Sequence, residues 1–353
     1  AGWTGSGVPG ASGVAGLSSA CCMKLILANP RGFCAGVFMA TDVVEQLLRA
    51  CPGESIFVYH DIVHNRHVVN RFQDRGVVFV EDVADVPEGS IVVFSAHGVS
   101  PAVREAARAR RLQIVDATCP LVTKVHAEAI RYARRGYQIL LVGHADHQEV
   151  IGTRGEAPEA TQVVESPEDI PNLVIHDPAR LVYLTQTTLS VNDADVIISA
   201  LKEAFPLIEG PPTEDICYAT TNRQSAVKQL APLADLTLVV GSTNSSNSKR
   251  LVEISESVGT PGHLIDDAGE IRPQWLEGVE TLLLTAGASA PEDLVRDVIL
   301  HLLEAEGGQV EQHEIHRENV EFAIPASLRR LMNARGTPLE GDRITLDMAG
   351  AID

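Results

Sequence analysis

Three cysteines far apart in the sequence share one local context, in which a strand-like apolar run precedes the cysteine and a helix-like run follows it. Around Cys119, the stretch IVDATCPLVTKVHAEAIRYARRG places proline at the first helical position and a glycine after the helix. Cys34 and Cys217 lie in similar stretches, MKLILANPRGFCAGVFMATDVVEQLLRA and EDICYATTNRQSAVKQLAPLAD. A helix start offers unpaired N–H groups and the positive end of the dipole, which lowers a thiol pKa and suits an anionic cofactor. We therefore expect these three cysteines to organise the chain.

The same series of elements follows each of these cysteines: a helix, a strand with a polar loop, and later a second strand with a polar loop. Polar residues take matching places in these loops: His64, His147 and Asn247 in the first loops, and His97, Thr187 and Ser289 in the second loops. The alternating helical and strand periods predict βαβ units, and the continuous apolar strands suit parallel sheets covered on both faces. The three cysteines are 85 and 98 residues apart, a spacing typical of small α/β domains rather than of a solenoid.

We therefore predict an α/β fold of three small α/β domains in a pseudo-threefold arrangement. Ligands of open α/β sheets bind at the carboxyl ends of the strands, where all the repeated positions lie, so we expect one central cavity. The expected parts of the chain are a disordered leader at 1–22, α/β domains at 23–117, 118–215 and 216–310, and a C-terminal closing segment and tail at 311–353. The Gly/Ser/Ala-rich leader lacks the pattern of a secretory signal, and Met23 is the expected natural first residue.

The charge of the chain limits its partners. It has 28 Lys+Arg against 47 Asp+Glu, a formal net charge of -19, which repels nucleic acid and anionic lipid. No apolar run is long enough to span a bilayer, so we expect no membrane role. The six cysteines show no regular disulfide framework, which indicates a reducing cytoplasm and thiols kept for metal binding or catalysis. An anionic ligand would need a locally neutral pocket rich in donors.

Three thiolates from separate domains can hold zinc together with a histidine, or three irons of a 4Fe-4S cluster whose fourth iron stays open. A structural zinc site usually has close Cys-x-x-Cys pairs, and this chain has none, which favours the cluster. Unconnected core cysteines are the alternative on residue types alone, and the repeated context argues against them.

The loop residues supply hydrogen-bond donors that suit phosphate oxygens without Lys or Arg: His64, His97, His147, Ser245, Asn247 and Ser289. Glu149, two residues after His147, fits a general acid, although a solvated glutamate at a helix start is the simpler reading. Thr187 could orient a hydroxyl or a water, or cap the next helix. The remaining loop histidines have no counterparts in the repeat, and we expect them to be structural: His60, His67, His126 and His144.

Eight motifs in order resemble the 4-hydroxy-3-methylbut-2-enyl diphosphate reductase family (IspH/LytB). They extend from about Met23 to about 310 and are RGFCAGV, VHNRHVV, SAHGVSP, DATCPLVTKVH, TQTTLS, DICYATTNRQ, NSSNSKRL and TAGASAP. The resemblance implies a central iron–sulfur cluster, with a 4Fe-4S group on Cys34, Cys119 and Cys217 and an open fourth iron. It also implies a substrate site made of His64, His97, His147, Thr187, Ser245, Ser246, Asn247 and Ser289. Of these, the residues implied to bind the diphosphate are His64, His97, His147, Ser245, Asn247 and Ser289.

By the same resemblance, Glu149 supplies protons and Thr187 lies near the substrate hydroxyl. The implied reaction removes that allylic hydroxyl with two electrons and two protons, giving isopentenyl and dimethylallyl diphosphate, the last step of the non-mevalonate isoprenoid pathway. A ferredoxin- or flavodoxin-type donor would supply the electrons. One departure is Gln148, where the family usually has proline, which bears on how firmly Glu149 is held. Two other function classes stay open from the residues: a non-enzymatic iron–sulfur sensor and a zinc hydrolase acting on a phosphorylated metabolite.

Overall fold

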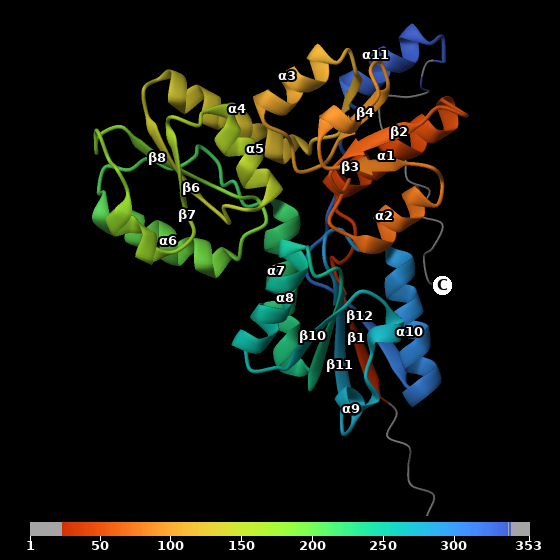
Figure 1. Cartoon of the computed structure of the whole chain (residues 1–353). Helices are drawn as coiled ribbons and strands as arrows, with labels where there is room; N and C mark the ends of the chain where they lie inside the picture. Colours follow the sequence, from red (N-terminus) through yellow and green to blue (C-terminus); the bar gives the residue numbers. More distant parts are fainter. Residues whose placement is uncertain (1–22, 338, 340–353) are drawn as a thin grey trace, which may run out of the picture.

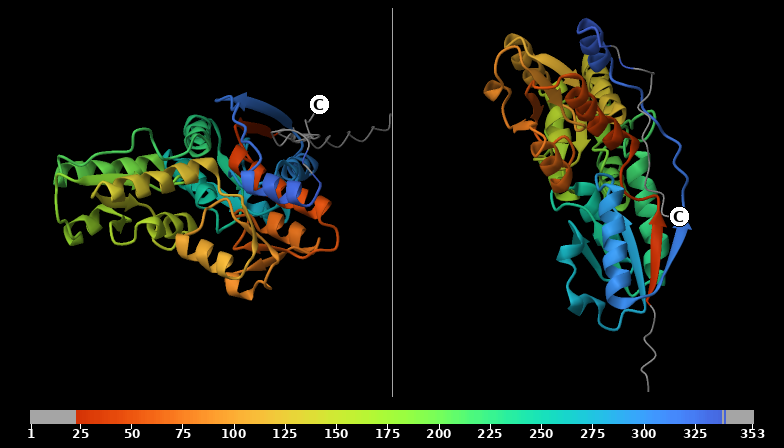
Figure 2. Two further views of the ribbon diagram at one scale, coloured as in Figure 1. Left: turned by 90° about the horizontal axis from the view of Figure 1, so that it is seen from above. Right: turned by 90° about the vertical axis from the view of Figure 1, so that its right-hand side faces the viewer.

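Three separate parallel β-sheets make up the computed structural model, which describes residues 23–337 and 339. The sheets have four, three and five strands, and with their helices we call them the first, second and third units. Figures 1 and 2 show the units as three lobes that meet at a common centre. All strand pairs between the described strands are parallel, which confirms the predicted α/β class. The predicted leader 1–22 and the predicted tail from 340 onward lie outside the described residues.

The first unit has strand order β3-β2-β4-β5. Its strands are β2 (Ile56–Tyr59), β3 (Val78–Val80), β4 (Ile91–Phe94) and β5 (Gln113–Asp116). Its helices are α1 (Ala35–Ala50), α2 (Arg66–Gln73) and α3 (Pro101–Ala109), with a 3-10 turn at Val83–Asp85.

The second unit has strand order β7-β6-β8. Its strands are β6 (Gln138–Val142), β7 (Thr161–Val164) and β8 (Leu181–Thr185). Its helices are α4 (Pro120–Arg134), α5 (Gln148–Glu156) and α6 (Val191–Ala204), with a 3-10 segment at Pro167–Asn172.

The third unit has strand order β10-β9-β11-β1-β12. Its strands are β1 (Lys24–Asn29), β9 (Leu236–Val240), β10 (Gly262–Ile265), β11 (Thr281–Ala286) and β12 (Gln309–Glu314). Its helices are α7 (Tyr218–Leu230), α8 (Ser246–Ser257), α9 (Pro273–Leu276) and α10 (Glu292–Glu306), with 3-10 turns at Ala231–Leu233 and Ala268–Glu270.

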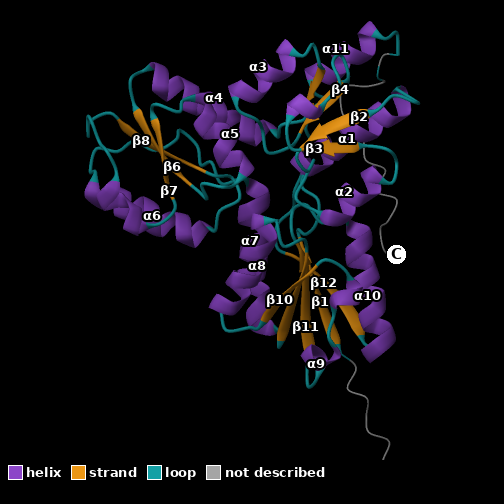
Figure 3. Cartoon of the chain, viewed as in Figure 1, coloured by secondary structure: helices purple, strands orange, loops and turns teal. Residues whose placement is uncertain are grey.

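Helices cover both faces of each sheet, as Figure 3 shows for the purple helices around the orange strands. Each unit accordingly has two apolar clusters, one on each side of its sheet. The central strands are therefore apolar at nearly every position, as in LTLVV of β9, where all residues are buried. This arrangement directs the carboxyl ends of the strands in all three units toward the centre of the molecule (Figure 1).

The chain crosses from one unit to the next at each of the three cysteines. β1 lies in the third-unit sheet, and after Cys34 the helix α1 packs in the core of the first unit. β5 lies in the first-unit sheet, and after Cys119 the helix α4 packs in the second unit. After Cys217, α7 packs in the third unit. Each thiol therefore stands at a junction between two units, which is why residues so far apart in sequence meet at the centre.

The sheets depart from the predicted boundary of the first domain, 23–117. β1 pairs with β11 on one side and β12 on the other, so this strand belongs to the third unit. The physical reason lies in its burial: Leu25 and Leu27 enter the cluster on one face of that sheet, and Ile26 and Ala28 enter the cluster on the other. A strand that is apolar on both faces needs a position inside a sheet, and the pattern alone does not say which sheet provides it.

The predicted closing segment ties two units together. β12 forms an edge of the third-unit sheet, and the helix α11 (Ala326–Ala334) packs on the first unit, where Leu328 and Met332 are fully buried in the core. The chain between β12 and α11 therefore spans the junction of the third and first units. We call residues 315–325 the strap. Within the part of the chain that the structure describes, no helix has the length and apolar character needed to cross a membrane.

Candidate active site

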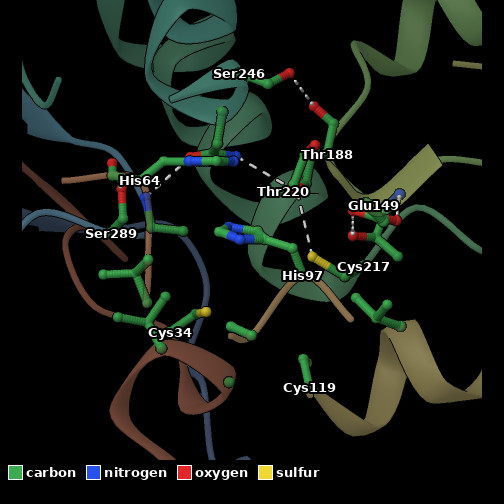
Figure 4. Close-up of a pocket in the computed structure, with 18 of the residues that line it drawn as sticks. Cys34, His64, His97, Cys119, Glu149, Thr188, Cys217, Thr220, Ser246 and Ser289 are labelled. Carbon is green, nitrogen blue, oxygen red and sulfur yellow. Dashed lines mark hydrogen bonds between the residues drawn. The ribbon is translucent and has the colours of Figure 1, made fainter. Parts of the chain in front are cut away.

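One cavity lies where the three units meet, and it is lined by all three repeated cysteines and all the polar loop residues of the repeat (Figure 4). The structure thus brings the predicted site residues together: Cys34, His64, His97, Cys119, His147, Glu149, Thr187, Cys217, Ser245, Ser246, Asn247 and Ser289. The first unit contributes Val63 and Ala96 as apolar wall, and α4 contributes Leu121 and Val122. Among the residues that the structure describes, no lysine or arginine lines this cavity.

The cysteines occupy equivalent places at one end of the cavity. Cys34, Cys119 and Cys217 are the N-cap residues of α1, α4 and α7, and none of the three side chains caps its own helix by a hydrogen bond. No acidic residue lies in the first turn of any of these helices. All three cysteines are free thiols. The thiols therefore face the cavity together with the positive ends of three helices.

A glycine allows two of the thiols to approach. A Cβ atom on Gly36, in the first turn of α1, would come within 2.7 Å of Cys119 Sγ and 3.9 Å of Cys34 Sγ. A larger residue there would occupy the space between the thiols. Among the described residues, no three His, Cys, Asp or Glu side chains are arranged to hold a single metal ion. The donor set consists of three soft sulfur ligands around a shared space, which fits an iron–sulfur cluster.

The helix starts predict lowered thiol pKa values, and for Cys119 and Cys217 in the protein without a cofactor this prediction is wrong. Burial raises the pKa of Cys217 to about 11, and the nearby Cys34 adds to this rise. Burial also raises the pKa of Cys119, and the backbone N–H groups of Leu121 and Val122 only partly oppose it. Removal from water outweighs the helix N-terminus at these positions.

Three histidines form a group at the other end of the cavity. The rings of His64 and His97 stack with centroids 3.8 Å apart, and the ring of His147 stands edge-on at 5.3 Å from His64 and 6.0 Å from His97. Each histidine follows the carboxyl end of a central strand, namely β2, β4 and β6. The three rings therefore come from two units and meet only through the tertiary structure.

Burial keeps these histidines neutral. It lowers the pKa of His64 to about 3 and that of His147 to about 4, and it holds the pKa of His97 well below its usual value. Both ring nitrogens of His64 and Nε2 of His147 are buried and have no hydrogen-bond partner among the described residues. Since buried polar atoms are nearly always paired, these nitrogens are available to a ligand in the cavity.

The third unit adds hydroxyl and amide groups from the start of α8 and the loop after β11. Ser289 Oγ donates to the carbonyl oxygen of His64 at 2.8 Å, which fixes the third unit against the first. The Asn247 amide oxygen accepts from the Ala288 N–H at 3.0 Å. Ser245 Oγ caps α8 by accepting from the Ser248 N–H at 3.3 Å. Ser246 Oγ lies 3.4 Å from the carbonyl oxygen of Thr188 in the second unit.

Glu149 is fully enclosed beside the histidines. Its carboxylate accepts from the Thr187 N–H at 2.6 Å and from Thr187 Oγ1 at 2.9 Å. Burial raises its pKa to about 7, although both hydrogen bonds from Thr187 oppose the rise. The backbone of α5 at this point is held by His147 Nδ1, which accepts from the Glu149 N–H at 3.2 Å. Hydrogen bonds therefore hold both the backbone and the side chain of Glu149, even though the preceding residue is Gln148 and not proline.

Sequence reasoning missed Thr220. It lines the cavity, its Oγ1 lies 3.2 Å from Cys217 Sγ, and it accepts from the Asn247 amide at 3.4 Å. Its position three residues after Cys217, on the first turn of a helix, was the signal that could have found it. The four histidines expected to be structural have protein partners: His60 faces Glu81, His67 faces Asp267, His126 faces Glu156 and His144 faces Arg250.

Comparison with known proteins reveals close relatives. A family model described as "LytB protein" matches residues 25–303. A protein of Acidothermus cellulolyticus named 4-hydroxy-3-methylbut-2-enyl diphosphate reductase is 51% identical over 330 residues, covering 92% of this chain and 97% of the relative. An Aeromonas hydrophila protein of the same name is 53% identical over 312 residues, covering 88% of this chain and 100% of the relative.

Solved structures agree with these relatives. The Plasmodium falciparum E-1-hydroxy-2-methyl-but-2-enyl-4-diphosphate reductase superposes with a TM-score of 0.86 at 40% identity, covering 89% of this chain and 99% of the other. A second structure, titled as (E)-4-hydroxy-3-methyl-but-2-enyl diphosphate reductase, the terminal enzyme of the non-mevalonate pathway, superposes with a TM-score of 0.59 at 34% identity. It covers 80% of this chain and 99% of the other.

Proposed function

This chain belongs to the LytB protein family, and on that premise we propose that it is a 4-hydroxy-3-methylbut-2-enyl diphosphate reductase, the terminal enzyme of the non-mevalonate pathway. The observation that carries the proposal is the single cavity that joins three free thiols, three neutral histidines and one buried carboxyl. The substrate loses its allylic hydroxyl: the C–O bond breaks, two electrons and one proton complete the carbon skeleton, and a second proton converts the hydroxyl to water. The products are isopentenyl and dimethylallyl diphosphate.

The family is one of iron–sulfur enzymes, and we propose that Cys34, Cys119 and Cys217 hold a 4Fe-4S cluster with one iron free of protein ligands. The fit of the residues supports this: the thiols are free, they face one space, and Gly36 keeps that space open. When bound, the cluster would supply the single electrons that the reduction needs. The positive ends of α1, α4 and α7 favour a negatively charged group at this place.

The diphosphate would bind at the opposite end of the cavity, to His64, His97, His147, Ser245, Ser246, Asn247 and Ser289. These groups offer N–H and O–H donors to phosphate oxygens, and the unpaired ring nitrogens of His64 and His147 are the strongest support for this assignment. The chain has a formal charge of -19, so an anionic diphosphate needs a pocket that is locally neutral and rich in hydrogen-bond donors, as this one is. Each hydrogen bond to a charged phosphate contributes roughly 1.5–3 kcal/mol.

Glu149 would donate the proton that turns the leaving hydroxyl into water. A carboxyl whose pKa is raised to about 7 holds its proton near neutral pH and can release it, which is the property required of a general acid. Thr187, which donates two hydrogen bonds to Glu149, would hold the carboxyl in place and orient the substrate hydroxyl. Glu149 is 2% exposed, so its proton is shielded from bulk water and would pass directly to the bound substrate.

We propose a ferredoxin- or flavodoxin-type protein as electron donor and the cytoplasm as the location, on the strength of the family. The proposed function is tested with protein purified without oxygen. We expect close to four irons and four sulfides per chain, and conversion of the allylic diphosphate to the two products with an artificial reductant. Stoichiometric zinc without sulfide, together with release of phosphate and no reduction, would instead support the zinc hydrolase. A cluster without any turnover would support the sensor.

A further inference from the structure

Arg223 is the largest side chain of the described core, and it is fully buried although it carries a charge. It lies on α7, six residues after Cys217. Its guanidinium donates to the carbonyl oxygen of Gly32 from two nitrogens, Nη2 at 2.8 Å and Nε at 3.2 Å, and to the carbonyl oxygen of Ala219 at 2.9 Å. Burying an arginine is costly unless all its donors are used, so this position has a strong geometric requirement.

The acceptor, Gly32, belongs to the loop that carries Cys34. Gly32 has a φ of +64°, which favours glycine, and its N–H donates to the Ala286 carbonyl oxygen at 3.2 Å. A second bond joins the same two elements, because the Ala35 N–H donates to Tyr218 Oη at 3.2 Å. The Cys34 loop is thus held to the helix that begins after Cys217, and the two thiols are positioned by one rigid connection.

The charge of Arg223 is balanced from the strap. Glu318 accepts from Arg223 Nη1 at 3.1 Å and from the Asn222 amide at 3.1 Å. A second contact follows at His316, whose Nε2 lies 3.0 Å from Ser225 Oγ. The strap therefore lies along α7, the helix that has Cys217 as its N-cap residue and Thr220 in its first turn.

The helix α11, which follows the strap, also contacts the loop that precedes the third cysteine. Ser327, at the start of α11, accepts from the Asp116 N–H at 3.0 Å. The Asp116 carboxylate in turn accepts from the N–H of Thr118 at 3.0 Å and from its hydroxyl at 2.5 Å. Since Thr118 precedes Cys119, the C-terminal segment contacts the supports of all three thiol positions.

We propose that Arg223 and Glu318 are positioning residues for the cluster: the guanidinium fork sets the separation of the Cys34 and Cys217 thiols, and Glu318 balances the buried positive charge on the helix that follows Cys217. The inference rests on the proposed cluster. The proposal assigns a different effect to each residue: the Arg223 fork controls the distance between the two thiols, and the Glu318 carboxylate controls the net charge of the buried pair. Buried charge and hydrogen bonding near an iron–sulfur cluster are known to set its reduction potential.

Two variants separate these effects, and one variant serves as a matched control. Arg223→Lys keeps the charge and loses the two-nitrogen fork. Glu318→Gln keeps the fork to Gly32 and loses the compensating charge. Glu54→Gln is the control. Glu54 also holds the C-terminal segment, through its ion pair with Arg335, but it contacts none of the loops that carry Cys34, Cys119 and Cys217.

Three quantities are measured on each full-length protein purified without oxygen: the rate of iron loss to a chelator, the midpoint potential of the cluster, and the Tm of the cluster-free chain. Arg223→Lys is expected to lose iron about tenfold faster than the parent with little change in potential. Glu318→Gln is expected to raise the ratio of reduced to oxidised cluster about tenfold at a given potential. This corresponds to a midpoint potential higher by about 59 mV for a one-electron couple. The uncompensated guanidinium favours the more negative, reduced cluster.

The controls make the result decisive. Glu54→Gln is expected to keep the parent iron-loss rate and potential even where its Tm falls. If Arg223→Lys and Glu318→Gln lower the Tm as the control does and leave iron loss and potential unchanged, the pair only stabilises the fold and the inference is overturned. Absence of iron and sulfide in the parent protein would instead overturn the proposed function, so the two failures are distinguishable.

Discussion

The two ends of the central cavity differ in how their helices begin. At the thiol end, the N-cap residues of α1, α4 and α7 are cysteines that make no side-chain capping bond. At the imidazole end, helix starts are capped by their own side chains: Asn65 for α2, Ser100 for α3, His147 for α5 and Ser245 for α8. The helix starts of the imidazole end are capped by the protein, and the groups left for a ligand there include the unpaired ring nitrogens of His64 and His147, whereas the thiol end leaves its helix N-termini for whatever group it binds.

This difference indicates that the protein itself preorganises the hydroxyl and amide groups of the imidazole end. The hydroxyl and amide groups of the imidazole end already make protein hydrogen bonds, as Ser289 does to His64 and Asn247 does to Ala288. The thiols have fewer such contacts, chiefly the one between Cys217 Sγ and Thr220 Oγ1 at 3.2 Å, and burial raises the pKa of Cys119 and Cys217. We therefore expect the thiol end to depend on its cofactor and the imidazole end to persist without it.

The largest expected effect comes from removing one thiol. In Cys119→Ser we expect loss of the cluster and a fall in turnover of at least about 10³, because one of three ligands is missing. Inorganic diphosphate should still bind within about threefold of the parent affinity, since we expect the imidazole end, and not the thiols, to hold it. Iron and sulfide analysis and calorimetric titration measure the two ends separately. Cys51→Ser is the control, because Cys51 lies in the core of the first unit, away from the cavity.

The next effect concerns Glu149, whose backbone N–H bonds to His147 and whose carboxyl lies near Cys217 (Figure 4), and which we propose as the proton donor. Glu149→Gln keeps the size, and its amide oxygen can still accept from the Thr187 N–H while its NH2 donates to Thr187 Oγ1. It cannot donate a carboxyl proton, so we expect single-turnover reduction to slow by roughly 10² or more. Cluster content and diphosphate affinity should be unchanged. A near-normal rate would show that the proton comes from elsewhere, for example from the substrate diphosphate.

The pH profile provides a second test of the same residue. Burial raises the pKa of Glu149 to about 7, so the acid form prevails below pH 7 and is lost above it. Single-turnover reduction by the parent should therefore fall as the pH rises through about 7, and the residual rate of Glu149→Gln should lack that fall. A parent profile that is flat between pH 6 and 8 would contradict the role of general acid.

The smallest expected effect comes from single donors of the imidazole end. His64→Ala and Asn247→Ala should each weaken binding of substrate and of inorganic diphosphate by roughly 1–3 kcal/mol, the range for one lost bond to a charged group. Both variants should keep a full cluster, which checks the independence of the two ends. The exposed His301→Ala, on α10 away from the cavity, is the matched control. Unchanged diphosphate affinity in both site variants would remove these residues from the binding site.

Much of the local structure follows from the sequence alone. Pro120 predicts the start of α4, and the apolar runs ahead of His64, His147 and Asn247 predict strands whose ends carry polar loops. The structure has these elements at those places, as β2, β6 and β9 followed by α2, α5 and α8. Such features depend on nearest neighbours along the chain, where backbone propensity and capping act, so the sequence contains the information needed.

The spatial relation of these elements was decided by the tertiary structure. The pattern of β1 fits a central position in any sheet, and only packing places it between β11 and β12, so that the chain crosses units at Cys34. The stacking of His64 on His97 and the burial that keeps both neutral depend on which units close around them. Burial likewise raises the pKa of Cys217, where the helix start by itself predicts a lower one. Desolvation acts through surroundings distant in sequence, so the sequence determined the kinds of groups present, and the assembled core determined their charge and their neighbours.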